Sequence, residues 1–461
     1  MTHRIISPVD GSVVAERPLA DDAEVERILS AARAARRQWR AIAVTDRVRL
    51  CRSMVDHLVA AVDDIAPEIT RLMGRPVRHT PNEILRGTRE RALHMASIAE
   101  EELADIEVPP ADGFTKFIRR DPVGTVLVVA PWNYPYLTAI NSVVPALLAG
   151  NTVVMKHASQ TLPCAERLAA ACAAAGIPDG VFQFVHASHS TVERMIGDAR
   201  IDFVVFTGSV QGGAAMERAA AGRFIGVGTE LGGKDPAYVR HDADIAFTVA
   251  ETVDGAFFNS GQSCCAIERL YVHRSVWDEF LERFVAETRS LVLGDPLDPS
   301  TTIGPMVNVA SADFVRSQVS SALARGARAL VDESHFPRAR AGTPYMGPVV
   351  LIDVDHSMDV MREESFGPVI GLMPVDSDDE AVALMNDSPY GLTASVWTSD
   401  QSAALAIGDS LETGTVFMNR CDYVDPVLVW SGVKDTGSGI ALSRLGFEPY
   451  TRTKSFHLRR R

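Results

Sequence analysis

The sequence has few cysteines, no long apolar run and no excess of positive charge, and each shortage excludes a class of protein. Six scattered cysteines in 461 residues do not make a disulfide framework, and no paired Cys-x-x-Cys motifs indicate a zinc site. The sequence contains no run of about 18 apolar residues, so it predicts no membrane-spanning helix. The net charge of −14 argues against binding to nucleic acid or to an anionic membrane surface.

The amino-terminal residues also lack the apolar core of a signal peptide. Together with the unpaired cysteines, this predicts a cytoplasmic protein in a reducing compartment. A chain of 461 residues exceeds the size of a single hydrophobic core, so we expect two or three domains. We expect the protein to bind no metal ion.

Periodicity divides the chain into a helical amino-terminal part and two regions of alternating strands and helices. Helices are expected over 21–41, 46–74 and 82–103, where Ala, Glu and Arg recur at helical spacing. The first alternating region begins near residue 125, and the second runs from about 229 to 419. Such alternation implies parallel sheets covered by helices.

The individual expectations are as follows. Strands are expected at 125–130, 152–156, 181–185, 203–206, 270–272, 347–353 and 369–374, and helices at 136–148, 163–175 and 191–196. The segment 226–229 is a plausible crossing point between the two regions.

A cysteine and a glutamate carry the most chemistry. Cys264 follows a polar, glycine-containing stretch in which Gly261 permits close approach to a ligand, so its thiolate could attack an electrophilic carbon. Glu230 begins Glu-Leu-Gly-Gly-Lys and could activate a water molecule. An inert packed cysteine and a surface carboxylate before a turn are the alternatives. We expect Cys265 to pack behind Cys264.

Two further residues follow expected strands. Asn133 in Pro131-Trp132-Asn133-Tyr134 could donate its amide to an oxyanion, or it could cap the next helix. Lys156 ends a strand, where a lysine is well placed for a ribose or phosphate, although a solvated lysine is the commoner case.

A glycine-rich turn follows the strand at 203–206. Gly208, Ser209 and Gly213 lie where a helix begins, and free N–H groups there could bind a pyrophosphate. The spacing differs from Gly-x-Gly-x-x-Gly, so an ordinary turn is the alternative.

Together these segments resemble the aldehyde dehydrogenase superfamily over essentially the whole chain. The motifs occur in one order along the sequence, which makes a chance match improbable. They are Pro-Trp-Asn at 131–133, Phe-Thr-Gly-Ser at 206–209, Glu-Leu-Gly-Gly-Lys at 230–234, Phe-x-x-x-Gly-Gln-x-Cys at 257–264, Glu-x-Phe-Gly-Pro at 364–368, Asn-Asp-Ser-Pro-Tyr-Gly-Leu at 386–392 and Gly-Val-Lys at 432–434.

The resemblance implies an α/β fold with a Rossmann-like cofactor domain, an α/β catalytic domain and a small β oligomerisation element. Because dimers and tetramers are usual in the family, we expect a homodimer or a homotetramer. The expected parts are 1–106 and 122–229 for the cofactor domain, 230–432 for the catalytic domain, 433–448 for a return to the cofactor domain, and 107–121 with 449–461 for the oligomerisation element.

The resemblance also implies roles for single residues. Cys264 would be the nucleophile, Glu230 the general base, and Asn133 with the Cys264 N–H the oxyanion hole. Relatives that transfer the acyl group to coenzyme A usually lack this glutamate, so its presence implies that water releases a carboxylic acid. The implied cofactor contacts are Pro131, Trp132, Lys156, Ser159, Gly208, Ser209, Gly213, Leu231, Gly232, Glu364 and Phe366.

One departure from the family concerns the cofactor. Lys156 is followed by His157, Ala158 and Ser159, where relatives often have Lys-Pro-x-Glu. Ser159 removes a carboxylate that would repel a ribose 2′-phosphate. We therefore expect that either NAD or NADP is used.

A second departure lies in the stretch that resembles the substrate tunnel. Asp422 and Asp425 could attract a cationic aminoaldehyde, and Tyr134, Tyr423 and Trp430 could supply aromatic walls. The alternative is that both aspartates are solvated turn residues.

The sequence therefore leaves open which small aldehyde is the substrate. An aminoaldehyde is the first candidate, and succinate semialdehyde, anchored by Arg420, is the second. A cofactor-independent cysteine esterase and a catalytically inactive structural binder are the alternatives from other classes.

Overall fold

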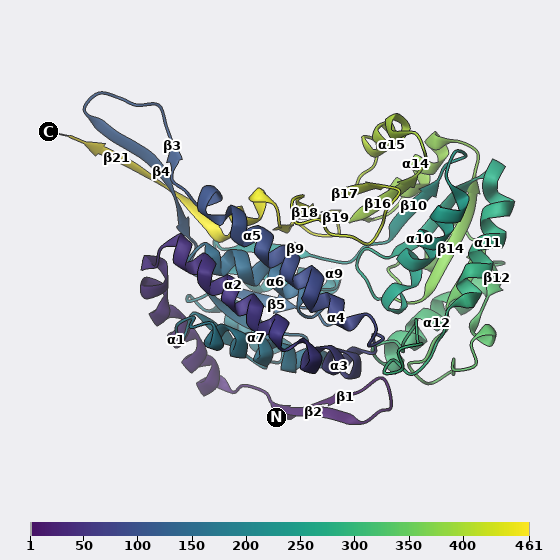
Figure 1. Cartoon of the computed structure of the whole chain (residues 1–461), viewed down its shortest axis with the longest axis horizontal. Helices are drawn as coiled ribbons and strands as arrows, with labels where there is room; N and C mark the ends of the chain where they lie inside the picture. Colours follow the sequence, from purple (N-terminus) through teal and green to yellow (C-terminus); the bar gives the residue numbers. More distant parts are fainter. Residues whose placement is uncertain (1, 461) are drawn as a thin grey trace.

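The computed structural model describes residues 2–460 and contains two helix-covered sheets and a projecting third sheet. Figure 1 shows the five-stranded sheet on the left, the seven-stranded sheet on the right, and the three-stranded sheet extending away from the body. The expected α/β class is confirmed. No helix within 2–460 is long and apolar enough to cross a membrane.

The five-stranded sheet is wholly parallel, with the order β7-β6-β5-β8-β9. Val126 and Val128 of β5 pack with α2, α6 and α7, whereas Leu127 and Val129 pack with α1, α8 and α9 on the other face. This alternation explains why every β5 residue is buried. The strands are β5 (Thr125–Ala130), β6 (Thr152–His157), β7 (Phe182–Phe184), β8 (Phe203–Thr207) and β9 (Gly226–Glu230).

The helices of this part match the expected ones with small shifts. The expected helix at 46–74 is divided at Ala61, and the one at 82–103 includes a π-helical turn. The helices are α1 (Asp22–Ala41), α2 (Val44–Ala60), α3 (Val62–Met73), α4 (Thr80–Asn82), η1 (Glu83–Thr88), α5 (Arg89–Glu102), α6 (Leu137–Leu148), α7 (Leu162–Ala174), α8 (His189–Gly197) and α9 (Val210–Ala220).

The helical expectation for the first hundred residues was wrong at the amino terminus. There β1 (Thr2–Ile6) and β2 (Val13–Pro18) form an antiparallel hairpin. Its turn contains Gly11 with a positive φ of 75°, which glycine adopts without strain. The Asp10-Gly11 pair was the available turn signal.

The seven-stranded sheet has the order β12-β13-β14-β11-β10-β16-β17, and β12 alone in it is antiparallel to its neighbour. The chain leaves the five-stranded sheet at Glu230 and enters this one at Asp235, close to the expected crossing point. The strands are β10 (Asp235–Val239), β11 (Ile267–His273), β12 (Arg328–Val331), β13 (Val349–Ile352), β14 (Val369–Val375), β16 (Thr393–Trp397) and β17 (Thr415–Met418).

Helices cover both faces of this sheet as well. One face packs against α10 and α11, and the other against α12 to α15. These are α10 (Ile245–Phe257), α11 (Trp277–Ser290), α12 (Val309–Ala324), α13 (Asp359–Arg362), α14 (Asp378–Asn386) and α15 (Gln401–Gly408).

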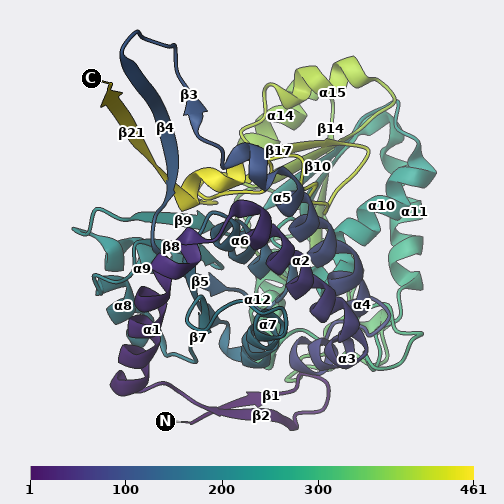
Figure 2. The ribbon, with the colours of Figure 1, turned by 60° about the vertical axis from the view of Figure 1, so that its left-hand side comes forward.

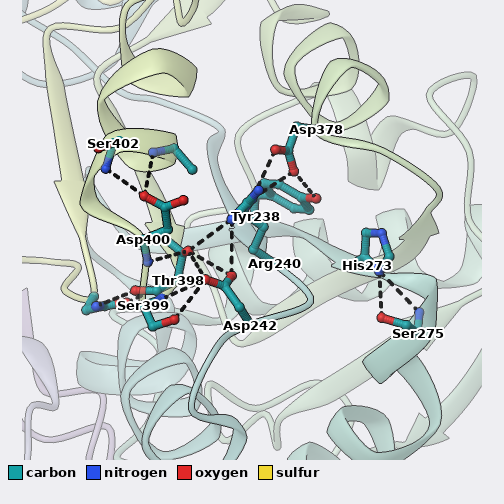
Figure 3. Close-up of polar contacts among 12 residues, drawn as sticks. Tyr238, Arg240, Asp242, His273, Ser275, Asp378, Thr398, Ser399, Asp400 and Ser402 are labelled. Atoms are coloured by element: carbon teal, nitrogen blue, oxygen red, sulfur yellow. Dashed lines mark hydrogen bonds and ion pairs between the residues drawn. The ribbon is translucent and has the colours of Figure 1, made fainter.

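A polar cluster lies at the carboxyl ends of β10 and β16 (Figure 3). Asp242 accepts hydrogen bonds from the Thr398 hydroxyl and from the N–H and hydroxyl of Ser399 at 2.8–3.2 Å. Arg240 Nε donates to Asp378 at 2.9 Å. Both carboxylates are thus held by donors, and the cluster ties loops and α14 to the sheet.

The third sheet consists of β3 (Ile106–Glu107), β4 (Phe114–Pro122) and β21 (Thr451–Arg459). β21 pairs antiparallel with β4 over its whole length, which places Phe456 opposite Phe117 with stacked rings 4.5 Å apart. Figure 2 shows this sheet standing clear of both helix-covered sheets. Four short strands form two further antiparallel pairs, in which β15 (Tyr390–Gly391) pairs with β19 (Val433–Lys434) and β18 (Trp430–Ser431) pairs with β20 (Ile440–Ala441).

Candidate active site

A cavity of about 810 Å³ collects most of the predicted site residues. The parallel strands β5, β6, β8 and β9 end at one edge of their sheet, and residues just after these ends line the cavity together with loops of the seven-stranded part. The predicted residues in its lining are Pro131, Trp132, Asn133, Lys156, Ser159, Gly208, Ser209, Glu230, Leu231, Gly232, Cys264, Glu364 and Phe366.

A strained turn presents Cys264 to this cavity. Asn259, Ser260 and Gly261 have successive positive φ values of 53°, 58° and 68°. A Cβ on Gly261 would lie 2.3 Å from a backbone carbonyl oxygen, so only glycine fits there. The Gln262 side chain accepts a backbone N–H bond at 2.8 Å, and Ser260 donates to a carbonyl at 2.8 Å. These bonds hold the turn, and Cys264 remains half-buried at the cavity wall.

Asn133 points towards the same turn. Its Nδ2 donates to the carbonyl of Gln262 at 3.2 Å, and the residue is buried. It does not cap α6, whose N-cap position is Tyr136. The alternative capping role is therefore contradicted, and the amide lies beside the backbone that leads to Cys264.

A buried ion pair supports Asn133, and the sequence alone did not reveal it. Arg75 pairs with Glu83 at 2.6 Å and donates to the Asn133 carbonyl. Glu83 in turn accepts the N–H groups of Tyr136 and Leu137 at 2.8 and 3.2 Å, which caps α6 in place of a local side chain. No local motif signals this arrangement because its members come from separate segments.

The Glu230 carboxylate is buried, and neither oxygen has a hydrogen-bond partner within residues 2–460. Burial raises its pKa to about 8. A Cβ on Gly439 would lie 2.5 Å from Oε1, so this glycine leaves room for the carboxylate. A partnerless acid with a pKa near neutrality is suited to proton transfer.

The strand β6 and the start of α9 contribute the polar residues of the cofactor side. Lys156 is 4% exposed, and burial lowers its pKa to about 8. Ser159 opens a short 3-10 turn, η2 (Ser159–Thr161). Ser209 accepts the Gly212 N–H at 3.2 Å and so caps α9.

Gly213 lies behind the cavity wall and not in it. A Cβ there would come within 2.7 Å of the Leu231 side chain, which itself lines the cavity. Gly213 thus has a packing role, and its direct contact with a cofactor stays a prediction. Its missing side chain makes space for Leu231.

The loop that carries Glu364 and Phe366 is held by Glu268, another residue the sequence did not reveal. Buried Glu268 accepts the Ser365 and Phe366 N–H groups at 2.8 and 3.0 Å. Lys234 bridges Glu268 and the Ser365 hydroxyl. This bonding allows Phe366 to adopt a positive φ of 50° and to meet the Trp132 ring edge-on at 5.6 Å.

The first glycine of the Glu-Leu-Gly-Gly-Lys motif, Gly232, has a steric reason to lack a side chain. A Cβ on Gly232 would lie 2.1 Å from the Glu364 carboxylate. Burial, reinforced by the nearby charge of Glu268, raises the pKa of Glu364 to about 8.

Asp422 is not a solvated turn residue. It has a positive φ of 43° and accepts hydrogen bonds from the Ser263 hydroxyl at 2.8 Å and the Cys265 thiol at 2.9 Å. Burial raises its pKa. It lies behind the nucleophile turn, and Cys265 packs there as expected. Asp425 accepts the Val427 N–H at 2.9 Å and is an ordinary turn residue.

The three aromatic candidates for a substrate wall lie outside the lining of the cavity. The Arg75 guanidinium covers the Tyr134 ring at 4.3 Å. Arg420 covers the Tyr423 ring at 3.5 Å, so both side chains are engaged with each other. Trp430 is buried in the core beneath the five-stranded sheet.

Comparison with known proteins identifies the chain. The model of the aldehyde dehydrogenase family matches residues 1–456. The chain belongs to this family. An aldehyde dehydrogenase of Paenarthrobacter nicotinovorans is 36% identical over 458 residues, covering 99% of each chain. The succinate semialdehyde dehydrogenase (NAD(P)+) of Escherichia coli strain K12 is 35% identical over 453 residues, covering 97% of this chain and 96% of its own.

A solved structure agrees with this assignment. The NAD-dependent aldehyde dehydrogenase from Sinorhizobium meliloti has a TM-score of 0.95 at 33% identity and covers 100% of this chain and 92% of its own. The expected aldehyde oxidation with NAD or NADP is confirmed by family membership.

Proposed function

We propose that this aldehyde dehydrogenase forms a thioester on Cys264 and releases it as a carboxylic acid by hydrolysis with Glu230. The observation that carries the proposal is the buried, partnerless carboxylate of Glu230 in the same cavity as Cys264. Structural carboxylates are normally hydrogen-bonded, so an unsatisfied one in a cavity favours a role in proton transfer.

The steps follow from the residues present. The Cys264 thiolate adds to the aldehyde carbon, and the oxygen becomes an oxyanion that the Asn133 amide and the Cys264 N–H stabilise. A bound NAD(P) would supply the hydride acceptor, so that loss of hydride from this carbon would leave a thioester on Cys264. Glu230 takes a proton from water as the water attacks the thioester, and the Cys264 sulfur is the leaving group.

The residues present fit the dinucleotide. Lys156 lines the cavity, and its ammonium group has no hydrogen bond or ion pair to another residue of 2–460. Gly232 leaves the main chain bare beside Glu364. Ser159 offers a hydroxyl and no carboxylate, so we propose that both NAD and NADP bind. The remaining contacts are assigned to Pro131, Trp132, Gly208, Ser209, Leu231, Glu364 and Phe366.

Trapping the acyl-enzyme tests this mechanism. Glu230→Gln removes the base but keeps the shape, so we expect one equivalent of NAD(P)H per Cys264 in a burst, followed by slow turnover. Intact-mass measurement should find the acyl group on the protein. Cys264→Ala should show neither burst nor adduct, and ester hydrolysis by wild type without nicotinamide as its main activity would favour the esterase instead.

For the substrate we propose a semialdehyde with a carboxylate end in place of the aminoaldehyde. Asp422 is engaged by Ser263 and Cys265 and is not free to attract a cation. The similar Escherichia coli protein is named for succinate semialdehyde. Initial rates with succinate semialdehyde and 4-aminobutanal decide between the two, and a preference for the amine would overturn the choice.

We also propose that the projecting sheet joins subunits into a homodimer or homotetramer. β21 is an edge strand with mostly exposed side chains, and a free strand edge is a ready pairing surface. Removal of residues 449–461 should lower the mass measured by light scattering.

We also propose the domain limits given by the sequence. The cofactor domain would comprise 1–106, 122–229 and 433–448, the catalytic domain 230–432, and the oligomerisation element 107–121 with 449–461.

The cellular location is proposed on the cysteines. All six are free thiols, and four of them are buried, which suits the reducing cytoplasm. Fractionation of the native host with antibodies to the protein would test this.

A further inference from the structure

Arg91 differs from the other buried arginines in how little of it is bonded. Arg47, Arg75, Arg91 and Arg269 are all buried. Arg75 and Arg269 use all three guanidinium nitrogens, and Arg47 uses two, with at least one bond of 2.8 Å or less in each. Arg91 bonds through Nη1 alone, at 3.5 Å to the Leu137 carbonyl and 3.3 Å to the Asn141 side chain.

The unbonded nitrogens of Arg91 are not completely sealed from solvent. Nε and Nη2 have no hydrogen-bond partner in residues 2–460, yet neither is among the fully buried polar atoms that lack one. They therefore keep contact with solvent although the residue is only 7% exposed. A largely buried guanidinium with so few hydrogen bonds is unfavourable unless a ligand completes its bonding.

Arg91 lies near the wall of the cavity that contains Cys264, although it is not itself among the lining residues. It is on α5, and its two acceptors flank Thr138 on α6, a residue that lines the cavity together with Cys264. Burial lowers the pKa of Arg91, and the neighbouring Cys265 and Cys264 are among the groups that oppose this shift, which is consistent with the placement of Arg91 near the cavity.

We propose that Arg91 binds the carboxylate end of the semialdehyde while its aldehyde end meets Cys264. The free Nε and Nη2 atoms are the pair that can bind a carboxylate with two hydrogen bonds. The same positive charge repels a protonated aminoaldehyde. This assignment rests on the proposed function and adds the residue that selects the substrate.

Kinetics of Arg91→Met on three aldehydes of equal length test the assignment. The substrates are succinate semialdehyde, neutral butanal and 4-aminobutanal. We expect KM for the semialdehyde to rise about 10- to 100-fold, the loss expected for charge-assisted hydrogen bonds, while kcat and KM for butanal change little. Succinate should inhibit butanal oxidation by wild type and lose this effect in Arg91→Met.

Matched variants separate binding from structure. Arg89→Met changes an exposed arginine of the same helix and should behave as wild type. Arg91→Lys keeps the charge but not the planar pair of donors, so we expect an intermediate KM for the semialdehyde. Arg420→Met tests the exposed arginine and should have no effect on KM.

The opposite results are equally clear. Equal losses for butanal and the semialdehyde in both Arg91 variants would show a structural role and overturn the assignment. A loss in Arg420→Met alone would move the anchor to Arg420. If wild type oxidised butanal but not the semialdehyde, Arg91 recognition would fail while the hydrolytic mechanism stood. Oxidation of no aldehyde at all would refute the proposed function itself.

Discussion

Two carboxylates follow parallel strands, one in each helix-covered sheet, and their surroundings are opposite. Burial tends to raise the pKa of Asp242, near the end of β10, but hydrogen bonds from Thr398 and Ser399 outweigh it and the pKa lies below its usual value. Glu230, at the end of β9, has no such bonds, and burial raises its pKa to about 8. Strand position alone therefore does not decide whether a carboxylate is structural or reactive.

The difference lies in what surrounds each oxygen. Asp242 accepts hydrogen bonds from the Thr398 hydroxyl and the Ser399 N–H, which lie just after the adjacent strand β16 (Figure 3). Around Glu230 glycine removes side chains and no residue of 2–460 offers a donor to its oxygens, although the residue lines the cavity. Such an unsatisfied group costs stability and is retained where chemistry needs it.

The largest expected effect comes from Cys264→Ala. Loss of the nucleophile should lower kcat/KM by at least about 10³-fold, because removing a covalent nucleophile removes the path through the thioester. Steady-state NAD(P)H absorbance measures this. Cys51→Ala, a buried cysteine of α2, should keep nearly full activity. Equal losses in both variants would contradict the assignment of Cys264.

The next largest effect is expected from Glu230→Gln, which removes the carboxylate that has no hydrogen bonds. We expect kcat to fall about 10²- to 10⁴-fold, the range for loss of a general base. In wild type, kcat should rise with pH towards about 8 as Glu230 loses its proton. The variant should lack this limb of the pH profile, and persistence of the limb would assign it to another group.

The same variant has a predicted effect on stability. Glu230 is protonated in the folded protein up to about pH 8 but ionises near its ordinary pKa when unfolded. Its contribution is therefore present below the unfolded pKa and is lost as pH rises through about 8. The Tm of Glu230→Gln minus that of wild type should grow between pH 5 and about 8. A difference independent of pH would contradict the raised pKa.

A new carboxylate in the cavity should have a smaller effect. Ser159→Glu should raise KM for NADP by about tenfold or more while KM for NAD changes little, because the charge repels a 2′-phosphate. Initial rates with each cofactor measure the ratio, and Ser159→Gln serves as a neutral control. An equal change for both cofactors would place residue 159 away from the ribose.

The smallest effect on catalysis should come from a change at Asp242, the carboxylate that is fully hydrogen-bonded. Asp242→Asn keeps the shape but weakens the bonds from Thr398 and Ser399. We expect a loss of ~1–2 kcal/mol in the free energy of unfolding and an unchanged kcat. Denaturant unfolding and steady-state rates measure both. A large fall in kcat would show that the two carboxylates are not opposites after all.

The sequence alone indicated the α/β class, the two regions of alternating strands and helices, and about half of the residues that line the cavity. Cys264, Glu230, Asn133 and Lys156 could be identified because each lies in a short motif next to a strand or a helix. Strand ends converge at one edge of a parallel sheet, so local motifs there meet without further information. The roles of these residues in the reaction stay predictions until the variants are measured.

Only the tertiary structure decided which carboxylates and cations are free. Arg75 contacts Asn133 across 58 residues of sequence and Asn259 across 184, and Glu268 reaches Ser365 across 97. Asp422 is half-buried and hydrogen-bonded, whereas Arg91 is buried and largely unbonded. Hydrogen-bond partners come from distant segments, so spacing along the chain cannot show whether a charged group is fully hydrogen-bonded. A charged group with all its partners has a structural role, whereas one without them is free to react or to bind a ligand.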